Sequence, residues 1–238
     1  MNPEINKYNT TDELFNNAAE RIVKIINEHI DKDGRCTFVL AGGNTPKQLY
    51  DLIVKDYSGS VDWDKVYFFW GDERCVPPDR EDSNYVMAYY HLLSGLNVNY
   101  RNVFRIRGEE PPGIGAQLYD TLIKSFFNNA FPSFDLFLLG VGRDGHTASL
   151  FPNSNILNET SKFVEADYYE KHESWRITLT LPIINEAKNV IFLAEGSSKA
   201  EIIKEIFINE NLNLPAQLVK PVNGKLSWFI DKEAGIYI

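Results

Sequence analysis

The stretch FDLFLLGVGRDGHTASLFP, residues 134–152, joins the most apolar run of the chain to a glycine-rich loop. A continuous apolar run such as 135–140 is typical of a strand that is buried on both faces of a sheet. Strand character is also found elsewhere, in CTFVL (36–40), VYFFW (66–70), VFRI (103–106), WRITLTL (175–181), NVIFLA (189–194) and KLSWFI (225–230).

Amphipathic helices are expected between these strands. The strongest covers residues 11–31, with Thr10 and Glu13 placed as a capping box and Gly34 at its end. Other helices are expected from Thr45-Pro46 onward and over 83–93, 114–127 and 198–209. The alternation predicts an α/β fold, a three-layer sandwich whose mainly parallel, Rossmann-like central sheet has helices on both faces. Since no repeat or linker interrupts it, residues 1–238 are expected to form a single domain.

The composition and net charge of the chain exclude several classes of binding partner and location. Of 238 residues, 44% are apolar and 24% charged, enough for a sizeable core. The net charge of −9 and the absence of a basic block disfavour nucleic acid and anionic membranes as partners. No apolar run is long enough to span a membrane and no signal peptide is recognisable, so we expect a cytoplasmic protein. The two cysteines and four histidines are scattered, which predicts neither a disulfide nor a metal site.

In an open α/β sheet, ligands bind beyond the carboxyl ends of the strands, and four loops there are unusual. The first is AGGNTP (41–46). Gly42 and Gly43 allow a tight turn and close approach to a ligand, and Asn44 and Thr45 at a helix start suit a phosphate. An ordinary capped turn explains the same residues equally well, because the loop lacks the lysine of a P-loop.

The second loop is GDERCVPP (71–78), which follows the strand VYFFW directly. There Asp72 could act as a base or orient one, and Arg74 could bind an oxyanion. From these residues alone, a solvated loop whose charges pair with each other is the favoured alternative.

The third loop, 140–152, matches the pattern GxGxxG through Gly140, Gly142 and Gly145. A dinucleotide site is disfavoured, because Pro152 leaves no room for a long helix and Asp144 would place negative charge beside a pyrophosphate. The loop is better interpreted as one that presents Asp144 and His146 at the sheet edge, where histidine can exchange protons near neutrality. A structural histidine is the simpler alternative.

The fourth loop is EGSSKA (195–200). Ser197 and Ser198 could cap the following helix, and Lys199 lies in its first turn, where a cation is unfavourable unless an anion is bound. A lysine that simply extends into solvent is an equal alternative.

Six segments, taken together and in order, resemble the 6-phosphogluconolactonase family within the wider glucosamine-6-phosphate isomerase/deaminase group. They are LAGGNTPKQLYDLI, WGDERCVPPDREDSNY, FDLFLLGVGRDGHTASLFP, RITLTLP, GSSKA and LPAQLV with GKLSWFID. The deaminases of this group carry a glutamate where this sequence has Phe151, and a DEY-like segment where it has Asp72-Glu73-Arg74. Because phenylalanine cannot replace a carboxylate as an acid or base, these differences favour the lactonases.

The resemblance implies hydrolysis of 6-phospho-D-glucono-1,5-lactone to 6-phospho-D-gluconate, the second step of the oxidative pentose phosphate pathway, without metal or organic cofactor. It implies that His146 is the general base and that Asp72 and Asp144 orient or polarise the site, without saying which one contacts His146. The residues implied for the substrate are Gly42, Gly43, Asn44, Thr45, Arg74, Arg176 and Lys199. Ser149 is a poor nucleophile candidate because no GxSxG elbow surrounds it.

Two alternatives remain at this stage. One is a glucosamine-6-phosphate deaminase or isomerase. The other is a sugar-phosphate sensor without catalysis, but such regulators carry a basic N-terminal helix-turn-helix, whereas this sequence begins almost directly with its core. We therefore expect a monomeric enzyme whose partner is a small phosphorylated lactone, with no role for nucleic acid or membrane. No role is assigned to Cys75.

Overall fold

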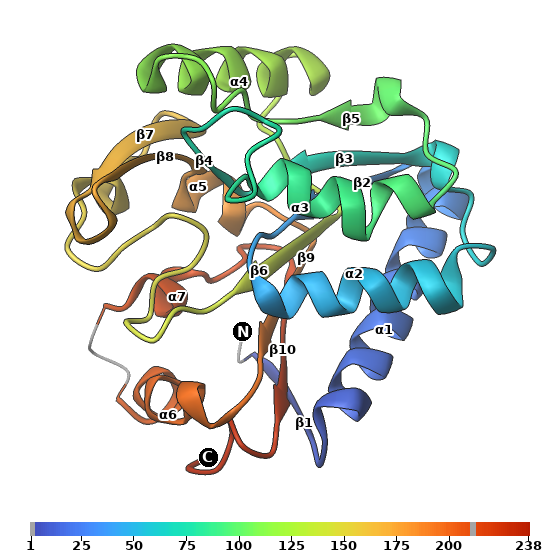
Figure 1. Ribbon diagram of the computed structural model, residues 1–238, viewed down its shortest axis with the longest axis vertical. Helices are drawn as coiled ribbons and strands as arrows, with labels where there is room; N and C mark the ends of the chain where they lie inside the picture. Colours follow the sequence, from blue (N-terminus) through green and yellow to red (C-terminus); the bar gives the residue numbers. More distant parts are fainter. Residues whose placement is uncertain (1–2, 210–212) are drawn as a thin grey trace.

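The computed structural model describes residues 3–209 and 213–238. Within them, seven parallel strands form a central sheet in the order β1-β10-β9-β6-β2-β3-β5 (Figure 1). The strands are β1 (Glu4–Tyr8), β2 (Cys36–Leu40), β3 (Val66–Trp70), β5 (Val103–Phe104), β6 (Leu136–Gly140), β9 (Asn189–Ala194) and β10 (Lys225–Asp231). The predicted α/β class with a mainly parallel sheet is confirmed.

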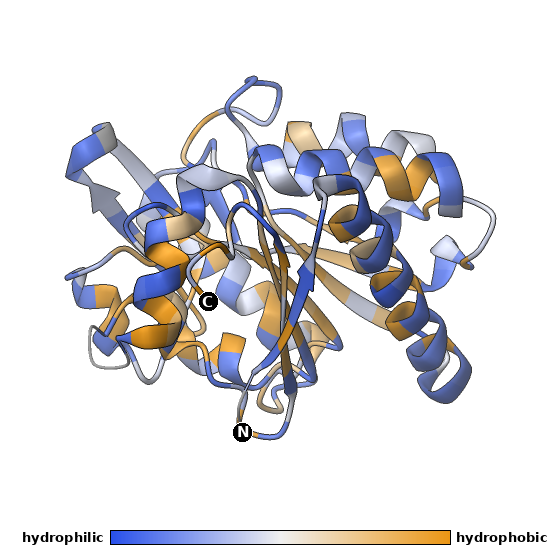
Figure 2. Cartoon of the chain, turned by 90° about the horizontal axis from the view of Figure 1, so that it is seen from below, coloured by the Kyte–Doolittle hydropathy of each residue, from blue (hydrophilic) through white to orange (hydrophobic). Residues whose placement is uncertain are grey.

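Helices cover both faces of this sheet, as predicted. They are α1 (Thr11–Asp33), α2 (Asn44–Tyr57), α3 (Asn84–His91), α4 (Pro112–Phe126), α5 (Leu181–Asn185), α6 (Ala200–Ile208) and α7 (Pro215–Leu218). Helices α1 and α2 pack against each other on one face, and α6 lies on the other (Figure 1). Figure 2 shows helices on both sides of the strands, with hydrophobic residues turned toward the sheet.

The ends of the first two helices follow local chemistry. The Thr10 side chain accepts a hydrogen bond from the Glu13 amide, and Gly34 ends α1 with a φ of 75°, which glycine adopts without steric cost. The second helix begins at Asn44, earlier than the predicted Thr45-Pro46. None of the helices in the described residues is both long and apolar enough to cross a membrane.

A smaller antiparallel sheet was not predicted. It contains β4 (Asp72–Arg74), β8 (Ser174–Leu179) and β7 (Val164–Tyr169), in the order β4-β8-β7, and α4 packs against it (Figure 1). The segment GDERCVPP therefore begins as a strand, where only a loop was expected. WRITLTL is a strand as predicted, but it runs antiparallel and outside the central sheet.

The order of the strands explains where a ligand can bind. From β2 the chain moves to β3 and β5 on one side, and it later returns to β6 on the other side of β2. The loops that leave β2 and β6 therefore diverge and open a crevice at the carboxyl ends of two neighbouring strands. Gly71 extends this edge, since its amide donates to the Leu40 carbonyl and its own carbonyl accepts from the Leu179 amide of the small sheet.

Candidate active site

A pocket lies at this switch point, beyond the carboxyl ends of β2, β3, β6 and β9. All the predicted site residues except Asp144 and Arg176 line it, which places there Gly42, Gly43, Asn44, Thr45, Asp72, Arg74, His146 and Lys199. Asn84 of α3 also lines it, although the sequence analysis did not assign it to the site.

The glycine turn after β2 forms one wall. Gly43 has a φ of 99°, a conformation that suits glycine, and it precedes α2 without providing a side-chain cap. The first amides of α2 therefore face the pocket end of the helix, where an anion is favoured. Gly42 allows close packing: a Cβ there would lie 1.9 Å from Oδ1 of Asn84.

His146 and Asp144 form a pair in the loop after β6. His146 Nδ1 lies 2.5 Å from Asp144 Oδ1, which also accepts a hydrogen bond from the His146 amide at 3.2 Å. The hydrogen bond with His146 holds the pKa of Asp144 well below its usual range. Asp144 is therefore the aspartate that contacts His146, a choice that the sequence left open. Since Nδ1 is engaged, Nε2 remains as the proton acceptor.

The loop after β6 contains turns and an isolated bridge between Thr147 and Leu150, with no helix between Gly140 and Asn155. Its GxGxxG pattern thus lacks the helix that a dinucleotide site requires. The glycine at position 142 has another use, because a Cβ there would lie 2.0 Å from His146 Nδ1. Gly142 makes room for the His–Asp pair.

Asp72 is buried, and its hydrogen bonds go to groups other than His146. Its Oδ2 accepts a hydrogen bond from Ser149 Oγ at 2.6 Å, and its Oδ1 accepts one from Asn84 Nδ2 at 3.3 Å. The favoured alternative of a solvated, self-paired loop is therefore wrong for Asp72, whose carboxylate is buried and bonded to neutral side chains. Ser149 and Asn84 were missed as site residues. The signal for Asn84 was its place at a helix start soon after the charged segment.

Glu73 links β4 to the start of α3 through hydrogen bonds. Glu73 is 2% exposed, and its carboxylate accepts hydrogen bonds from the amides of Arg74, Asn84 and Tyr85 and from Ser83 Oγ, at 2.7–3.0 Å. Burial raises the pKa of Glu73 to about 7, although these donors favour its charged form. Glu73 thus sets the position of Asn84, which in turn contacts Asp72 and Gly42.

Three cations gather beside the pocket. Lys199 Nζ donates to the Val141 carbonyl at 2.7 Å, which ties the fourth predicted loop to the third, and burial lowers the pKa of Lys199. Arg74 and Arg176 lie opposite each other on β4 and β8. The buried Nε atoms of both arginines have no hydrogen-bond partner among the described residues. Such donors are suited to an anion, because leaving them unpaired is costly.

The predicted capping by Ser197 and Ser198 is wrong. These residues form a single 3-10 turn with Lys199, and neither the cap of this turn nor that of α6 has a side-chain hydrogen bond. The start of α6 is therefore held by backbone contacts and by the bond from Lys199 to Val141.

One cluster in the described residues has the composition of a metal site: His29, Asp33 and Asp135. It lies at the amino ends of β2 and β6, away from the pocket, and Lys188 Nζ already donates to Asp135 at 2.6 Å. An ammonium group beside a carboxylate disfavours a second cation there. We infer that the three side chains have a structural role, in which they join the end of α1 to the amino ends of β2 and β6.

Comparison with known proteins identifies the family. Residues 9–228 match the family described as glucosamine-6-phosphate isomerases/6-phosphogluconolactonase. The chain belongs to this family. Within the glucosamine-6-phosphate isomerase/6-phosphogluconolactonase family, a probable 6-phosphogluconolactonase 1 of Arabidopsis thaliana is 39% identical over 249 residues, covering 98% of this chain and 92% of that protein. The 6-phosphogluconolactonase of Nostoc sp. is 36% identical over 228 residues, covering 93% and 92%.

A solved structure of the same family agrees. The 6-phosphogluconolactonase of Trypanosoma cruzi superimposes with a TM-score of 0.90 at 29% identity, covering 100% of this chain and 97% of that one. These family members are named as lactonases, in line with the resemblance found in the sequence.

Proposed function

We propose that the chain hydrolyses 6-phospho-D-glucono-1,5-lactone to 6-phospho-D-gluconate, the second step of the oxidative pentose phosphate pathway. The observation that carries this proposal is the Asp144–His146 pair, which brings a histidine to a pocket bordered by cations. The lactonase relatives that cover most of the chain support the same substrate. The expected monomeric state, the cytoplasmic location and the absence of a cofactor stay predictions.

The proposed reaction begins with water placed between His146 and the lactone carbonyl. As the water oxygen bonds to C1, one of its protons passes to His146 Nε2, and the Asp144 carboxylate stabilises the imidazolium through Nδ1–H. The tetrahedral intermediate then expels the ring oxygen, which takes the proton from Nε2. His146 returns to its neutral form, and the product is the open-chain acid.

The phosphate group of the substrate is assigned to the part of the pocket formed by the start of α2, away from His146. The start of α2, with Gly42, Gly43, Asn44 and Thr45, offers amide and side-chain donors. Lys199 and Arg74 contribute positive charge from the pocket wall, and Arg176 adds charge from the neighbouring strand β8, opposite Arg74. A phosphate dianion in the pocket would interact favourably with the positive charge of these guanidinium groups.

Asp72 is assigned a polarising role. Asp72 lines the pocket, its carboxylate accepts hydrogen bonds from the neutral side chains of Asn84 and Ser149, and it interacts electrostatically with Arg176. A fixed carboxylate at this place can accept a hydrogen bond from a lactone hydroxyl or from the attacking water.

General-base catalysis and substrate positioning by these residues are sufficient for lactone hydrolysis. A lactone is an activated ester, and a positioned general base contributes roughly 10²–10⁴-fold to its hydrolysis. Holding the phosphate and the carbonyl in one geometry adds to that factor. The mechanism therefore needs no covalent nucleophile, and Ser149 is used instead to hold Asp72.

The test is an assay that follows loss of the phosphorylated lactone against its spontaneous hydrolysis. We expect enzyme-dependent acceleration and no ammonia from glucosamine 6-phosphate. Robust ammonia release would favour the deaminase, and tight binding of the sugar phosphate without turnover would favour a sensor.

Replacing Lys199 by methionine should raise KM for the lactone and leave kcat within a few-fold. The lost charge-assisted hydrogen bond to phosphate corresponds to about 1.5–3 kcal/mol, or roughly 10- to 150-fold in KM. Lys204→Met is a matched control, because Lys204 of α6 is partly exposed and does not line the pocket, and its Nζ lies 3.9 Å from Glu201 Oε2. Equal KM values for the two variants would remove Lys199 from the phosphate site.

Replacing Asp144 by asparagine should lower kcat about tenfold or more with little change in KM. The amide has nearly the size of the carboxylate but carries no charge to stabilise the imidazolium. Steady-state kinetics on the lactone measure the changes in kcat and KM separately. A rise in KM at constant kcat would instead place Asp144 in substrate binding.

A further inference from the structure

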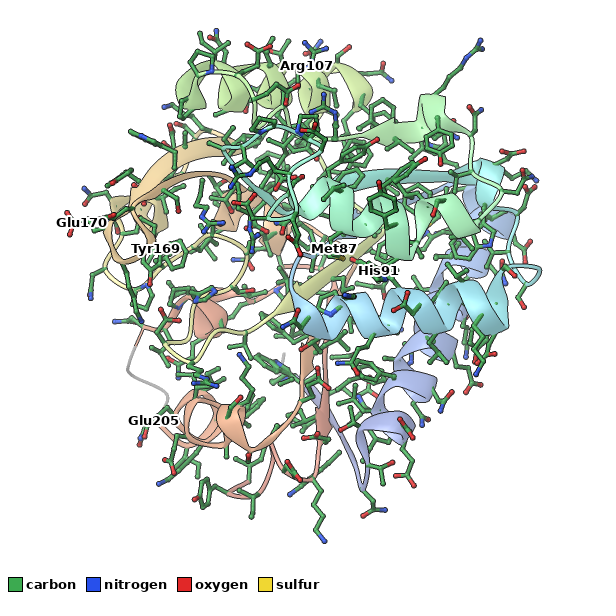
Figure 3. The ribbon with its side chains drawn as sticks, viewed as in Figure 1. Met87, His91, Arg107, Tyr169, Glu170 and Glu205 are labelled. Carbon is green, nitrogen blue, oxygen red and sulfur yellow. The ribbon has the colours of Figure 1, made fainter. Side chains whose placement is uncertain are left out.

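Tyr169, at the end of β7, approaches the His–Asp pair from the small sheet. Its ring stacks on Phe151 with centroids 3.5 Å apart and planes 3° apart, and the Phe151 ring lies 4.8 Å from that of His146. Tyr169 Oη donates to Asp144 Oδ2 at 3.4 Å. Figure 3 labels Tyr169 where β7 comes beside the loop that follows β6.

The two oxygens of Asp144 therefore have different partners. Oδ1 faces the imidazole and the backbone of His146, while Oδ2 faces the Tyr169 hydroxyl. We propose that Tyr169 is a positioning residue for the reaction, which orients the Asp144 carboxylate and draws part of its charge away from His146. This inference rests on the proposed function, in which His146 is the general base.

The stack supplies the rigidity that this role needs. Phe151 is buried and lies between the two rings, so it fixes the plane of Tyr169 and the direction of its hydroxyl. A hydroxyl on a long, freely rotating side chain would lose more entropy in making the same contact. Phe151, which distinguishes this loop from the deaminase pattern, thus has a structural role in holding the Tyr169 ring.

Other charges also act on the pair. Lys199 interacts electrostatically with Asp144, Arg143 interacts with Lys199, and Arg176 interacts with Tyr169. These groups stay in place when only the Tyr169 hydroxyl is removed. A difference between the wild type and Tyr169→Phe therefore reports on the hydroxyl alone.

The first measurement is the pH dependence of kcat for Tyr169→Phe. Without the hydroxyl, more of the Asp144 charge acts on the imidazole and stabilises its protonated form, which is inactive as a base. We expect the acid limb of the kcat profile to move to higher pH by about 0.5 unit, the equivalent of one weak hydrogen bond, with KM unchanged within about twofold. A purely structural role would lower activity at all pH values without moving the limb.

The matched control is Tyr168→Phe. Tyr168 is the neighbouring residue on β7, it is exposed, and its ring pairs with Trp175 at 5.5 Å between centroids. Since successive side chains of a strand point to opposite faces, this variant removes a hydroxyl that faces away from Asp144. We expect its profile to match the wild type.

The second measurement does not depend on turnover. The proton between His146 Nδ1 and Asp144 Oδ1 should give a downfield NMR resonance that is missing in His146→Ala. Because Asp144 becomes a stronger acceptor, we expect this resonance to move further downfield in Tyr169→Phe and to stay in place in Tyr168→Phe. An unmoved acid limb with an unmoved resonance would overturn the inference. If the wild type hydrolyses the lactone, that result leaves the proposed function intact, whereas absence of turnover overturns the function itself.

Discussion

His146→Ala is expected to lower kcat for the lactone by about 10²-fold or more, while KM changes little. The variant loses the group that takes the proton from water and returns it to the ring oxygen. The phosphate contacts assigned to the start of α2, Lys199 and Arg74 remain. Comparison of steady-state rates, corrected for spontaneous hydrolysis, measures the loss.

The chain provides a matched control in His91→Ala. His91 also pairs with a carboxylate, since its Nδ1 lies 2.7 Å from Asp51 Oδ1, but this pair joins α3 to α2 and His91 does not line the pocket (Figure 3). We expect near-wild-type turnover for this variant. If His146→Ala retained comparable turnover, His146 would not be the base and the mechanism would be wrong.

Gly142→Ala is expected to lower kcat by about 10²-fold through geometry alone, because small misplacements of catalytic groups have effects of this size. The added methyl would lie 2.0 Å from Nδ1 and 2.2 Å from Cε1 of His146, and 2.7 Å from Oδ1 of Asp144. These are shorter than any tolerated contact, so the imidazole must leave its place. The hydrogen bond between the Gly142 amide and the His146 carbonyl links the same two residues through the backbone.

Gly59→Ala tests whether the effect is specific. Gly59 lies in the exposed turn after α2, does not line the pocket, and a Cβ there would meet no atom within 4 Å. We expect this variant to keep its activity. Equal activity of the two alanine variants would show that the space beside His146 is not needed for catalysis.

The main sheet could be predicted because its inner strands are buried on both faces. Three of them, β2, β3 and β9, have the predicted bounds, since nearly every residue in them is apolar. The first strand, EINKY, was missed because it is a mostly exposed edge strand that pairs only with β10. In the small sheet, β8 was predicted as a strand, but β4 and β7 were missed. β4 has only three residues, and its pairing with β8 joins segments about a hundred residues apart.

The location of the site could be predicted, because ligands of open α/β sheets bind at loops beyond the carboxyl ends of the strands. The pocket contains residues from all four loops that were predicted on this basis. The partners of the individual side chains could not be predicted. Asp72 meets Ser149, which is 77 residues away, and Asp144 meets Tyr169, which is 25 residues away. No local pattern records such contacts, because they depend on how the small sheet packs beside the central one.

The pocket is built from segments that begin near residue 41 and end near residue 199. During synthesis, the wall that carries Lys199 is made long after the turn at Gly43, and among the described residues that follow α6 the elements are the short α7 and β10. Nascent chains that stop before this wall have the glycine turn and the histidine but lack a cation that would hold the sugar phosphate. Affinity for the ligand therefore arises late, and a bound sugar phosphate favours the completed fold over every shorter intermediate.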